Sequence, residues 1–421
     1  MRLNRDLSGI KSRKVETDAA METSVRKILD SVKSGGDSAV RKYAEMFDSF
    51  NGENLLVSDA EIQSSMLAAE PDFLELLKRA RAQIEEFHKN QIEKSWSVHN
   101  ENGVMMGQIM RPIKRVALYV PGGTAFYPSS VLMNAIPAKL AGVKELAIFT
   151  PVKDSGTVSD SIIAAAVTCG VNTIYKIGGA HGIAAAAYGT QTIPKFDKIV
   201  GPGNAYVATA KRLVYGEVDI DMIAGPSEVL IIADHTANPK YVAADLMSQA
   251  EHDVMSSAIL ITTCETLIKD TEAEIERQIG GLSRASIIYK SLENHGAAIL
   301  ADNLEAAFAI ANDLAPEHLE ILTENPIEKL SLVQNAGSIF LGENTPEPLG
   351  DYMSGTNHVL PTGGTAKFYS PLGVYDFVKF SSFSYYPRKA LEKLKEDVIN
   401  FSALEGLDAH ANSIKVRFDN D

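Results

Sequence analysis

Between Val116 and Asp234 the sequence alternates between short apolar runs and alanine-rich segments. The runs VALYV, ELAIFT, TIYKIGG, KIVGPG and EVLIIAD are rich in β-branched residues, and segments such as SSVLMNAIPAKLAG and NAYVATAKRLVYG separate most of them. Near-continuous apolar strands separated by helices are typical of a parallel sheet that is covered on both faces. This stretch therefore predicts an α/β fold.

A second alternating set follows the first. It begins with a helix at YVAADLMSQAEHD, a strand at SAILITT and a helix at TLIKDTEAEIERQIGG. It continues through the apolar runs ASIIYK, AAILAD and SIFLG, with the helix LEAAFAIANDLA between the last two. We predict two doubly wound, incomplete Rossmann-like units with small helical extensions at the N- and C-termini.

The segments that flank these two sets have helical spacing. ETSVRKILDSVKSGG and PDFLELLKRARAQIEEFHKN come first, a candidate hairpin turn at Asn102-Gly103 introduces strands, and PRKALEKLKEDVINFSALEG lies near the C-terminus. At 421 residues the chain is long enough for two or more domains. We expect an N-terminal extension at 1–19, a first α/β domain at 20–118 plus 230–372, a second at 119–229, and a C-terminal helical arm at 373–421 that packs on another unit or subunit.

Charge and apolar patterning argue against several classes of protein. The formal net charge is −14, which disfavours nucleic acid or an anionic membrane as the main partner. No run approaches the roughly 20 apolar residues of a membrane span, and the N-terminal MRLNRDLSGIKSRK lacks the apolar segment of a signal peptide. The cysteines, Cys169 and Cys264, do not form a paired framework. A cytoplasmic protein is expected.

Polar groups stand where a core would not need them. Gln249 and His252 share a face at the end of a helix and suit a zinc site, although a helix C-terminal turn is the alternative interpretation. Asp351 opens the polar loop GDYMSGTNHVLPTGGT, where it could bind a metal or simply cap a turn. Glu317 and His318 are a candidate acid–base pair, or else one inward and one solvated residue.

The glycine-rich turn VPGGTAFYPSS follows a strand and precedes a helix, as phosphate-binding turns do. It lacks the Gly-x-Gly-x-x-Gly spacing, so no dinucleotide fingerprint is present. IVGPGNAYV and IGGAHGIAAA are further turns of this kind. Because such turns meet at the carboxyl edge of a parallel sheet, they predict a ligand crevice without identifying its occupant.

With these segments in order, the sequence resembles the histidinol dehydrogenase family from its first helices to its C-terminus. The most specific stretches are IVGPGNAYVATAKR, IDMIAGPSEVLIIAD, DLMSQAEHD, LAPEHLEI, GDYMSGTNHVLPTGGTAKFYSPLGVYDF and EGLDAHANSIKVR. The resemblance implies an NAD-dependent, four-electron oxidation of L-histidinol through histidinal to L-histidine, with one zinc ion per subunit. It also implies a homodimer in which the C-terminal arm supplies Glu405 and His410 to the partner's site.

Matching positions carry the family's site residues. The resemblance implies zinc ligands at Gln249, His252, Asp351 and His410, and proton acceptors at Glu317 and His318. It implies NAD contacts on the 119–229 side at Tyr119, His181 and Asn204. It places histidinol against Ser227, Gln249, His252, His318, Asp351, Glu405 and His410. One position departs from the family, since His181 stands where the family pattern Gly-Gly-Ala-Gln has glutamine.

The expected chemistry divides between the two bases. His318 would remove the alcohol proton as hydride leaves, Glu317 would activate water for the bound aldehyde, and zinc would anchor the substrate. Three alternatives stay open: a related dehydrogenase for another polar alcohol, a zinc hydrolase with Glu317 as base, and a catalytically silent scaffold. Ser227 and Glu405 favour histidinol, because a carboxylate can receive a cationic or N–H-bearing group.

Overall fold

The structure is a computed structural model, which describes residues 2–3, 19–52, 54–122, 127–152 and 156–419. Contacts divide the chain into two units. The first consists of residues 1–92 and 113–377, and the second of residues 93–112 and 378–421. The four-part division expected from the sequence remains a prediction.

A five-stranded parallel sheet of order β6-β5-β4-β7-β8 in the first unit contains the first four runs of the first alternating set. The fifth run, EVLIIAD, was grouped with them from the sequence but lies in the other sheet, as β9 (Glu228–Ala233). The strands are β4 (Arg115–Tyr119), β5 (Glu145–Phe149), β6 (Thr173–Tyr175), β7 (Lys198–Val200) and β8 (Asp219–Ile220). The helices between them are α6 (Pro128–Ala141), α7 (Asp160–Thr168), α8 (Gly179–Tyr188) and α9 (Ala205–Val214).

Alternation along each strand sends neighbouring side chains to opposite faces of this sheet. Ala117 and Tyr119 join a core with α8, α9 and the N-terminal helices α2 (Ala19–Gly35) and α3 (Asp37–Asp48). Val116 and Leu118 are equally buried, and α6 contacts their strand. Next to α6 and α7 pack α4 (Asp59–Ala68) and α5 (Pro71–His88), which continues into η1 (Lys89–Gln91).

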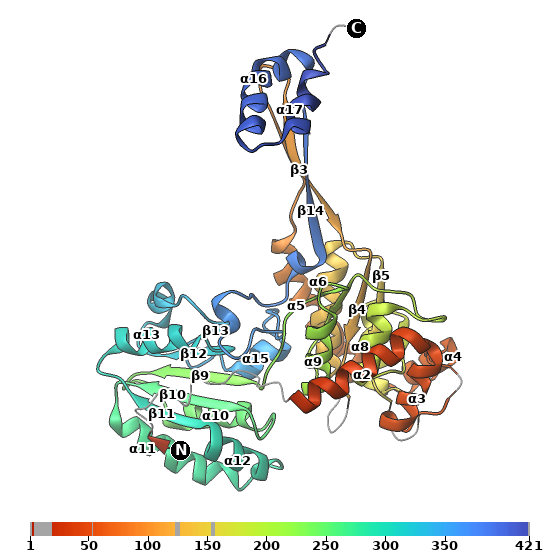
Figure 1. The fold of residues 1–421 in the computed structure, drawn as a ribbon. Coiled ribbons are helices and arrows are strands. Elements are labelled where there is room, and N and C mark those ends of the chain that lie inside the picture. The colour runs from red at the N-terminus through yellow and green to blue at the C-terminus, as the bar shows by residue number, and fades with distance from the viewer. Residues whose placement is uncertain (1, 4–18, 53, 123–126, 153–155, 420–421) are drawn as a thin grey trace. The chain divides into compact units, whose positions relative to one another are not determined.

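Strands of the second alternating set, together with β9 and the N-terminal β1, form a six-stranded parallel sheet of order β1-β11-β10-β9-β12-β13 (Figure 1). One face carries Val229 and Ile231, packed with α10, α11 and α12, and the other carries Leu230 and Ile232, packed with α13. The strands are β1 (Arg2–Leu3), β9 (Glu228–Ala233), β10 (Ser257–Thr262), β11 (Gly296–Leu300), β12 (His318–Leu322) and β13 (Ser338–Leu341).

The helices of this part of the chain begin with α10 (Pro239–Ala250), α11 (Glu265–Ile279), α12 (Ala285–His295) and α13 (Leu304–Leu314). Shorter elements follow: α14 (Pro326–Lys329), η2 (Leu330–Leu332), α15 (Glu347–Tyr352), η3 (Thr365–Lys367) and η4 (Val374–Phe377). The run ASIIYK, expected to continue the alternation as a strand, is the first half of α12. Its buried residues Ile288, Ser291 and Leu292 recur at helical spacing, which becomes visible only when the segment is extended to His295.

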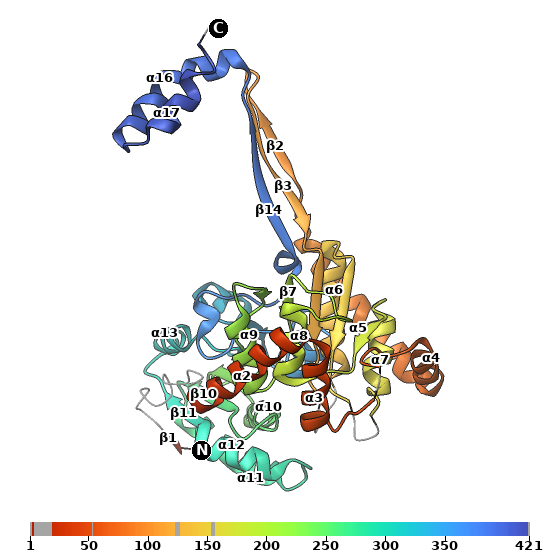
Figure 2. The same cartoon turned by 45° about the vertical axis from the view of Figure 1, so that its right-hand side comes forward.

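The second unit is an antiparallel sheet of order β14-β3-β2 followed by two helices (Figure 2). Its elements are β2 (Trp96–His99), β3 (Met105–Pro112), β14 (Val378–Tyr385), α16 (Arg388–Leu404) and α17 (Asp408–Lys415). The hairpin turn expected at Asn102-Gly103 is confirmed: Gly103 has a φ of 73°, and the Asn100 side chain accepts from the N–H groups of Asn102 and Val104. The C-terminal arm was expected to be helical, and the structure adds β14 to it.

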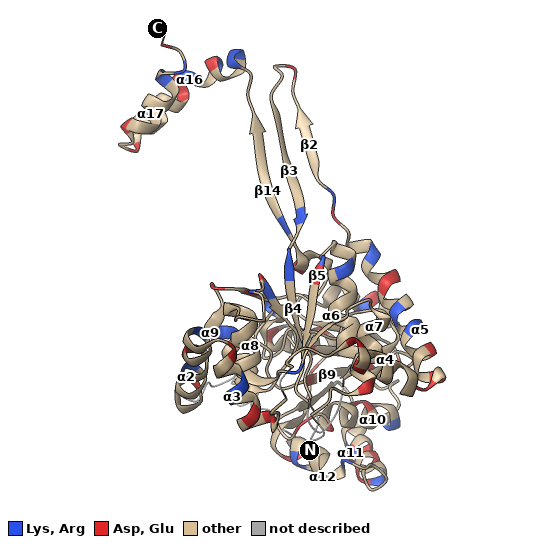
Figure 3. Ribbon diagram, turned by 90° about the vertical axis from the view of Figure 1, so that its right-hand side faces the viewer, with Lys and Arg blue, Asp and Glu red and all other residues tan. Residues whose placement is uncertain are grey.

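Few charged residues lie on the three strands of the second unit (Figure 3). In β2 every side chain is exposed, including those of Trp96 and Val98. In the described part of the chain, none of the helices combines the length and apolarity that a membrane crossing requires. The prediction of an α/β fold with parallel sheets is confirmed.

Candidate active site

Glu317 and His318 both bind the main chain of one residue on the neighbouring strand. The Glu317 carboxylate accepts the Glu228 N–H at 2.8 Å, and Nδ1 of His318 lies 2.9 Å from the Glu228 carbonyl oxygen. Glu317 precedes β12, and His318 is its first residue and pairs with Val229 of β9. Because Glu317 lies outside the regular strand, the two side chains do not diverge to opposite faces. Nδ1 of His318 lies 3.6 Å from Oε2 of Glu317.

The chain enters this pair through Ala315 and Pro316. Ala315 ends α13 in the left-handed region, at φ 48° and ψ 64°. Proline disfavours a right-handed helical conformation in the residue before it, and a left-handed C-cap satisfies that restriction.

Burial sets the protonation of both groups. The His318 side chain is buried, which lowers its pKa to about 4, so the imidazole is neutral at neutral pH. Since a carbonyl oxygen only accepts, Nδ1 carries the hydrogen and Nε2 keeps its lone pair. Burial raises the pKa of Glu317 well above its ordinary value, and the nearby Glu228, Asp351 and Glu347 carboxylates add to this effect. An ionised Glu317 is therefore a stronger base than an exposed glutamate.

Gln249 is the candidate ligand with the most unusual surroundings. It lies in the last turn of α10 and is completely buried, yet neither its amide oxygen nor its amide nitrogen has a hydrogen-bond partner among the described residues. A buried amide usually finds partners, so these free atoms fit a position where a bound group completes the site. His252 is exposed one turn further on, where its N–H bonds to the Gln249 carbonyl at 3.2 Å. Both candidate ligands thus belong to one helix end.

Asp351 lies in the short helix α15, rather than in the loop expected from the sequence. His358, which follows in the loop, bonds through Nδ1 to the Asp351 carbonyl oxygen at 3.2 Å. The sequence pattern did not predict this helix, because Pro346 directly precedes it and Gly350 lowers the intrinsic helix propensity of the segment. A contact from the Ser248 hydroxyl to the Glu347 carboxylate, at 3.5 Å, connects α15 with α10.

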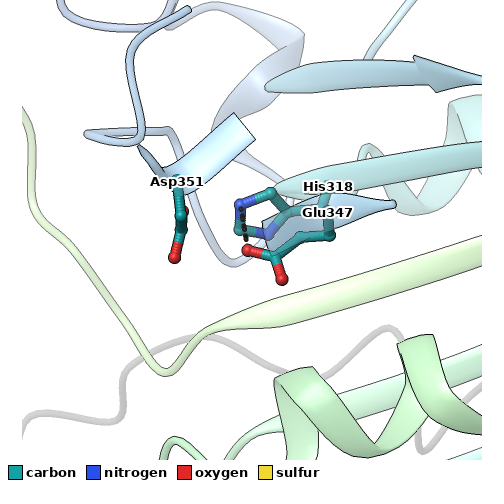
Figure 4. Close-up of side chains that lie close together, drawn as sticks. All are labelled: His318, Glu347 and Asp351. Atoms are coloured by element: carbon teal, nitrogen blue, oxygen red, sulfur yellow. Dashed lines mark ion pairs between the residues drawn. The ribbon is translucent and has the colours of Figure 1, made fainter. Parts of the chain in front are cut away.

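Glu347 is a candidate site residue that the sequence analysis missed. Ligand atoms of His318, Glu347 and Asp351 lie within 4.8 Å of one another, an arrangement that could hold a metal ion (Figure 4). Nε2 of His318 is 3.6 Å from the Glu347 carboxylate. Burial and the Asp351 charge raise the pKa of Glu347 to about 9. The spacing of Glu347 and Asp351, four apart on one helix face, is the signal that could have revealed it.

The candidate residues of the 119–229 segment gather at the carboxyl edge of the five-stranded sheet, except Ser227. The Tyr119 hydroxyl, at the end of β4, accepts from the Gly179 N–H at 3.0 Å. Asn204 caps α9, and its side-chain oxygen accepts from Tyr206 and Val207. Ser227 directly precedes β9 and Glu228 in the other sheet. The turns that contain Gly178 and Gly201 thus meet at one edge, as parallel strands require. The turn VPGGTAFYPSS includes residues 123–126, which lie outside the described residues.

His181 lies in the first turn of α8, and its side chain is completely buried. The imidazole packs against the stacked rings of Tyr43 and Phe47 of α3. Nε2 lies 3.3 Å from the Asp48 carboxylate, which also accepts from the Gly178 N–H at 3.4 Å. These contacts connect α3 with the first turn of α8.

Glu405 and His410 belong to the second unit, whereas the other candidate residues belong to the first. Glu405 follows α16 as its C-cap, and His410 lies in α17. Both are exposed. Their assignment to a shared site remains a prediction.

Comparison with known proteins supports one family. The family model described as histidinol dehydrogenase matches residues 11–418 of the chain. The chain belongs to the histidinol dehydrogenase family. A histidinol dehydrogenase of Lactococcus lactis is 58% identical over 409 residues, covering 97% of this chain and 95% of that protein. One from Clostridium acetobutylicum is 54% identical, with the same coverage of both chains.

A solved structure agrees with this membership of the histidinol dehydrogenase family. The crystal structure of histidinol dehydrogenase from Elizabethkingia anophelis matches with a TM-score of 0.94 and 38% identity, over 99% of this chain and 97% of that one. The resemblance drawn from the motifs is therefore confirmed, and with it the prediction of an oxidoreductase enzyme in histidine biosynthesis.

Proposed function

We propose that this chain oxidises L-histidinol to L-histidine through histidinal, with NAD as the hydride acceptor in both oxidations. The observation that carries the proposal is the pair of buried bases, Glu317 and His318, held by the main chain of Glu228. An alcohol and an aldehyde hydrate each need a proton acceptor when hydride leaves carbon. Family membership supplies the substrate class.

His318 is the proposed base for the substrate hydroxyl. Its Nδ1 hydrogen is engaged by Glu228, so Nε2 is the atom that can accept a proton. Because its pKa is lowered to about 4, the ring is uncharged and ready to act at neutral pH. The bond at Nδ1 also fixes the orientation of the ring, which reduces the motion needed to reach the reacting geometry.

Glu317 is the proposed base for the second half of the reaction. It would take a proton from water as the water oxygen adds to the aldehyde carbon, giving the hydrate anion. The C–H hydrogen of that anion leaves as hydride to NAD, which leaves the carboxylic acid. Burial strengthens this carboxylate as a base. In this assignment His318 acts on the substrate oxygen and Glu317 acts on the incoming water.

For a divalent metal ion we propose the ligands Gln249, His252 and Asp351, together with His410 of the partner subunit. The fit rests on the free amide of buried Gln249 and on the mixture of imidazole, amide and carboxylate donors, which suits zinc. The ion would hold the substrate in position and lend positive charge to the site. We leave His318 and Glu347 outside this set, because the base needs Nε2 free.

For NAD we propose the carboxyl edge of the five-stranded sheet, with Tyr119 and Asn204 as contacts. Ser227 and Glu405 of the partner subunit would contact histidinol, together with the metal ligands and His318. We keep His181 on the NAD side of the site, where its pairing with Asp48 would support the first turn of α8.

We also propose a homodimer with shared sites. Large apolar side chains are exposed on both parts of the second unit, among them Trp96, Phe380, Phe401 and Leu404. Soluble chains rarely expose so many unless a partner covers them. The C-terminal arm would then bring Glu405 and His410 to the neighbouring subunit.

The test is a steady-state assay of NADH formation from L-histidinol and NAD, before and after chelation and after zinc is restored. We expect activity that is lost with the metal and regained with zinc. NADH formation with another alcohol but not with histidinol would identify a different dehydrogenase. Hydrolysis without any NADH would contradict the proposal.

A further inference from the structure

The strand order of the five-stranded sheet reverses direction between β4 and β7. From β4 the chain proceeds to β5 and β6 on one side, and then crosses to β7 and β8 on the other. In open parallel sheets, ligands bind beyond the carboxyl ends of the strands at this point. Tyr119 ends β4, and Gly201 directly follows β7, so these residues border the expected crevice.

Gly201 starts a turn that passes very close to the end of β4. Its φ is +112°, and an added Cβ would lie only 2.1 Å from the Tyr119 carbonyl oxygen. No residue with a side chain fits there. Three residues later Asn204 caps α9, so the conformation of Gly201 sets the path of the segment that carries this proposed NAD contact.

One buried ion pair binds both peptide groups of Gly201. The Asp221 carboxylate accepts the Gly201 N–H at 2.7 Å, and the Lys211 ammonium group donates to the Gly201 carbonyl at 2.9 Å. Lys211 and Asp221 also pair directly with each other. Their side chains are 2% and 1% exposed, so this arrangement is almost completely shielded from water.

Stability alone is a weak reason for such a pair. Removing two charges from water is expensive, and replacing a buried ion pair with apolar residues of similar size is often neutral or stabilising. What an apolar pair cannot do is bind an N–H and a carbonyl at the same time. The function that Lys211 and Asp221 add is therefore the fixed orientation of Gly201.

We propose that Lys211 and Asp221 are positioning residues for NAD. They hold the turn 201–204 at the point where the strand order reverses, so that the dinucleotide meets a preformed surface. This inference rests on the proposed function, because it takes NAD as the ligand of this sheet edge.

A second lysine–aspartate pair, on β7 and β8, the strands that directly precede Gly201 and Asp221, serves as the control. Lys198 of β7 is also buried, and it pairs with Asp219 of β8 at 2.8 Å. This pair lies at the start of the two strands, where Lys198 is directly in register with Asp219. Among the described residues, neither side chain is hydrogen-bonded to the turn 201–204.

The experiment compares Lys211→Met, the double variant Lys211→Met/Asp221→Leu, and the control Lys198→Met with the wild-type holoenzyme. For each we would measure the Kd for NAD by calorimetry without histidinol, then kcat, both KM values and Tm. We expect the Kd and KM for NAD to rise about tenfold or more in both Lys211 variants, because a small misplacement of a binding group is costly. The KM for histidinol should change less than about threefold in the same variants. Lys198→Met should leave the Kd for NAD unchanged.

In the double variant the Met and Leu side chains fill the space of the ion pair without leaving a buried charge unpaired. The double variant therefore tests the inference even if the single variant folds poorly. A double variant that melts near the wild-type temperature and still binds NAD with wild-type affinity would overturn the inference. So would an equal loss of NAD affinity in Lys198→Met, or a wild-type protein that does not bind NAD. A wild-type protein that binds NAD but does not oxidise histidinol would overturn the proposed function and leave the positioning role intact.

Discussion

His318 donates the hydrogen on Nδ1 to the main-chain carbonyl oxygen of Glu228, 2.9 Å away. Glu228 in turn donates its main-chain N–H to the Glu317 carboxylate. A main-chain anchor cannot be removed by a side-chain change at position 228, and it cannot rotate. The two proposed bases are therefore oriented by the pairing of β12 with β9, and the orientation survives as long as the sheet does.

The two bases should be separable by substitution. We expect His318→Asn to impair oxidation of histidinol and Glu317→Gln to impair oxidation of histidinal, each by about 100- to 10,000-fold, the usual contribution of a positioned acid or base. Histidinol and histidinal would be assayed as separate substrates with NAD. Equal loss of both activities in both variants would show that no such division exists.

Gln249→Leu should separate metal binding from folding. Removing a buried amide that has no partner relieves a penalty of about 1–3 kcal/mol, so the metal-free variant should be at least as stable as the metal-free wild type. Its zinc content should fall. Zinc analysis and thermal melts of both forms test this, with Gln278→Leu as a control, because Gln278 bonds to the Lys240 carbonyl instead. Full zinc content in Gln249→Leu would remove Gln249 from the ligand set.

Glu347→Gln distinguishes the two possible ligand sets. If zinc is held by Gln249, His252 and Asp351, Glu347→Gln should change zinc content less than about twofold, because Glu347 then supplies no ligand atom. If zinc is held by His318, Glu347 and Asp351, the variant should lose most of its metal. The measurement is zinc per subunit after dialysis, with Asp351→Asn as the variant that must lose metal in both cases.

Histidine 88 should make stability depend on pH. His88 is completely buried, Nδ1 bonds to the Gln91 amide oxygen at 2.8 Å, and Nε2 has no partner among the described residues. Burial lowers the pKa of His88 below the ordinary value of 6.5, so the unfolded chain binds the proton more readily than the folded one. The free energy of unfolding that depends on neutral His88 is therefore fully present above pH 6.5. It is lost as the pH falls from 6.5 toward the pKa of His88 in the folded state.

Replacing His88 with glutamine should flatten that dependence. Denaturant unfolding between neutral and mildly acidic pH would show a smaller decrease in the free energy of unfolding for His88→Gln than for the wild type. His235→Gln is the control, because His235 is exposed. Parallel curves for wild type and His88→Gln would show that His88 is not a source of the pH dependence.

Much of the fold follows from local pattern. Strands such as β9 and β10 are buried at every position, so their runs are apolar throughout and easy to recognise. The run at 285–290 was assigned wrongly because a short apolar run fits either a buried strand or one turn of a helix. The hairpin at Asn102-Gly103 was predictable because its turn chemistry is local.

The sequence by itself determined the α/β class, the family and the residue types available for the chemistry, since these depend on local periodicity and on motifs in chain order. Only the tertiary structure decided that Glu317 and His318 meet Glu228, that Glu347 lies beside Asp351 and His318, and that Lys211 and Asp221 enclose Gly201. The reason is physical. Which strand lies next to which is set by packing of whole faces, and residues some 90 positions apart along the chain carry no local signal of that choice.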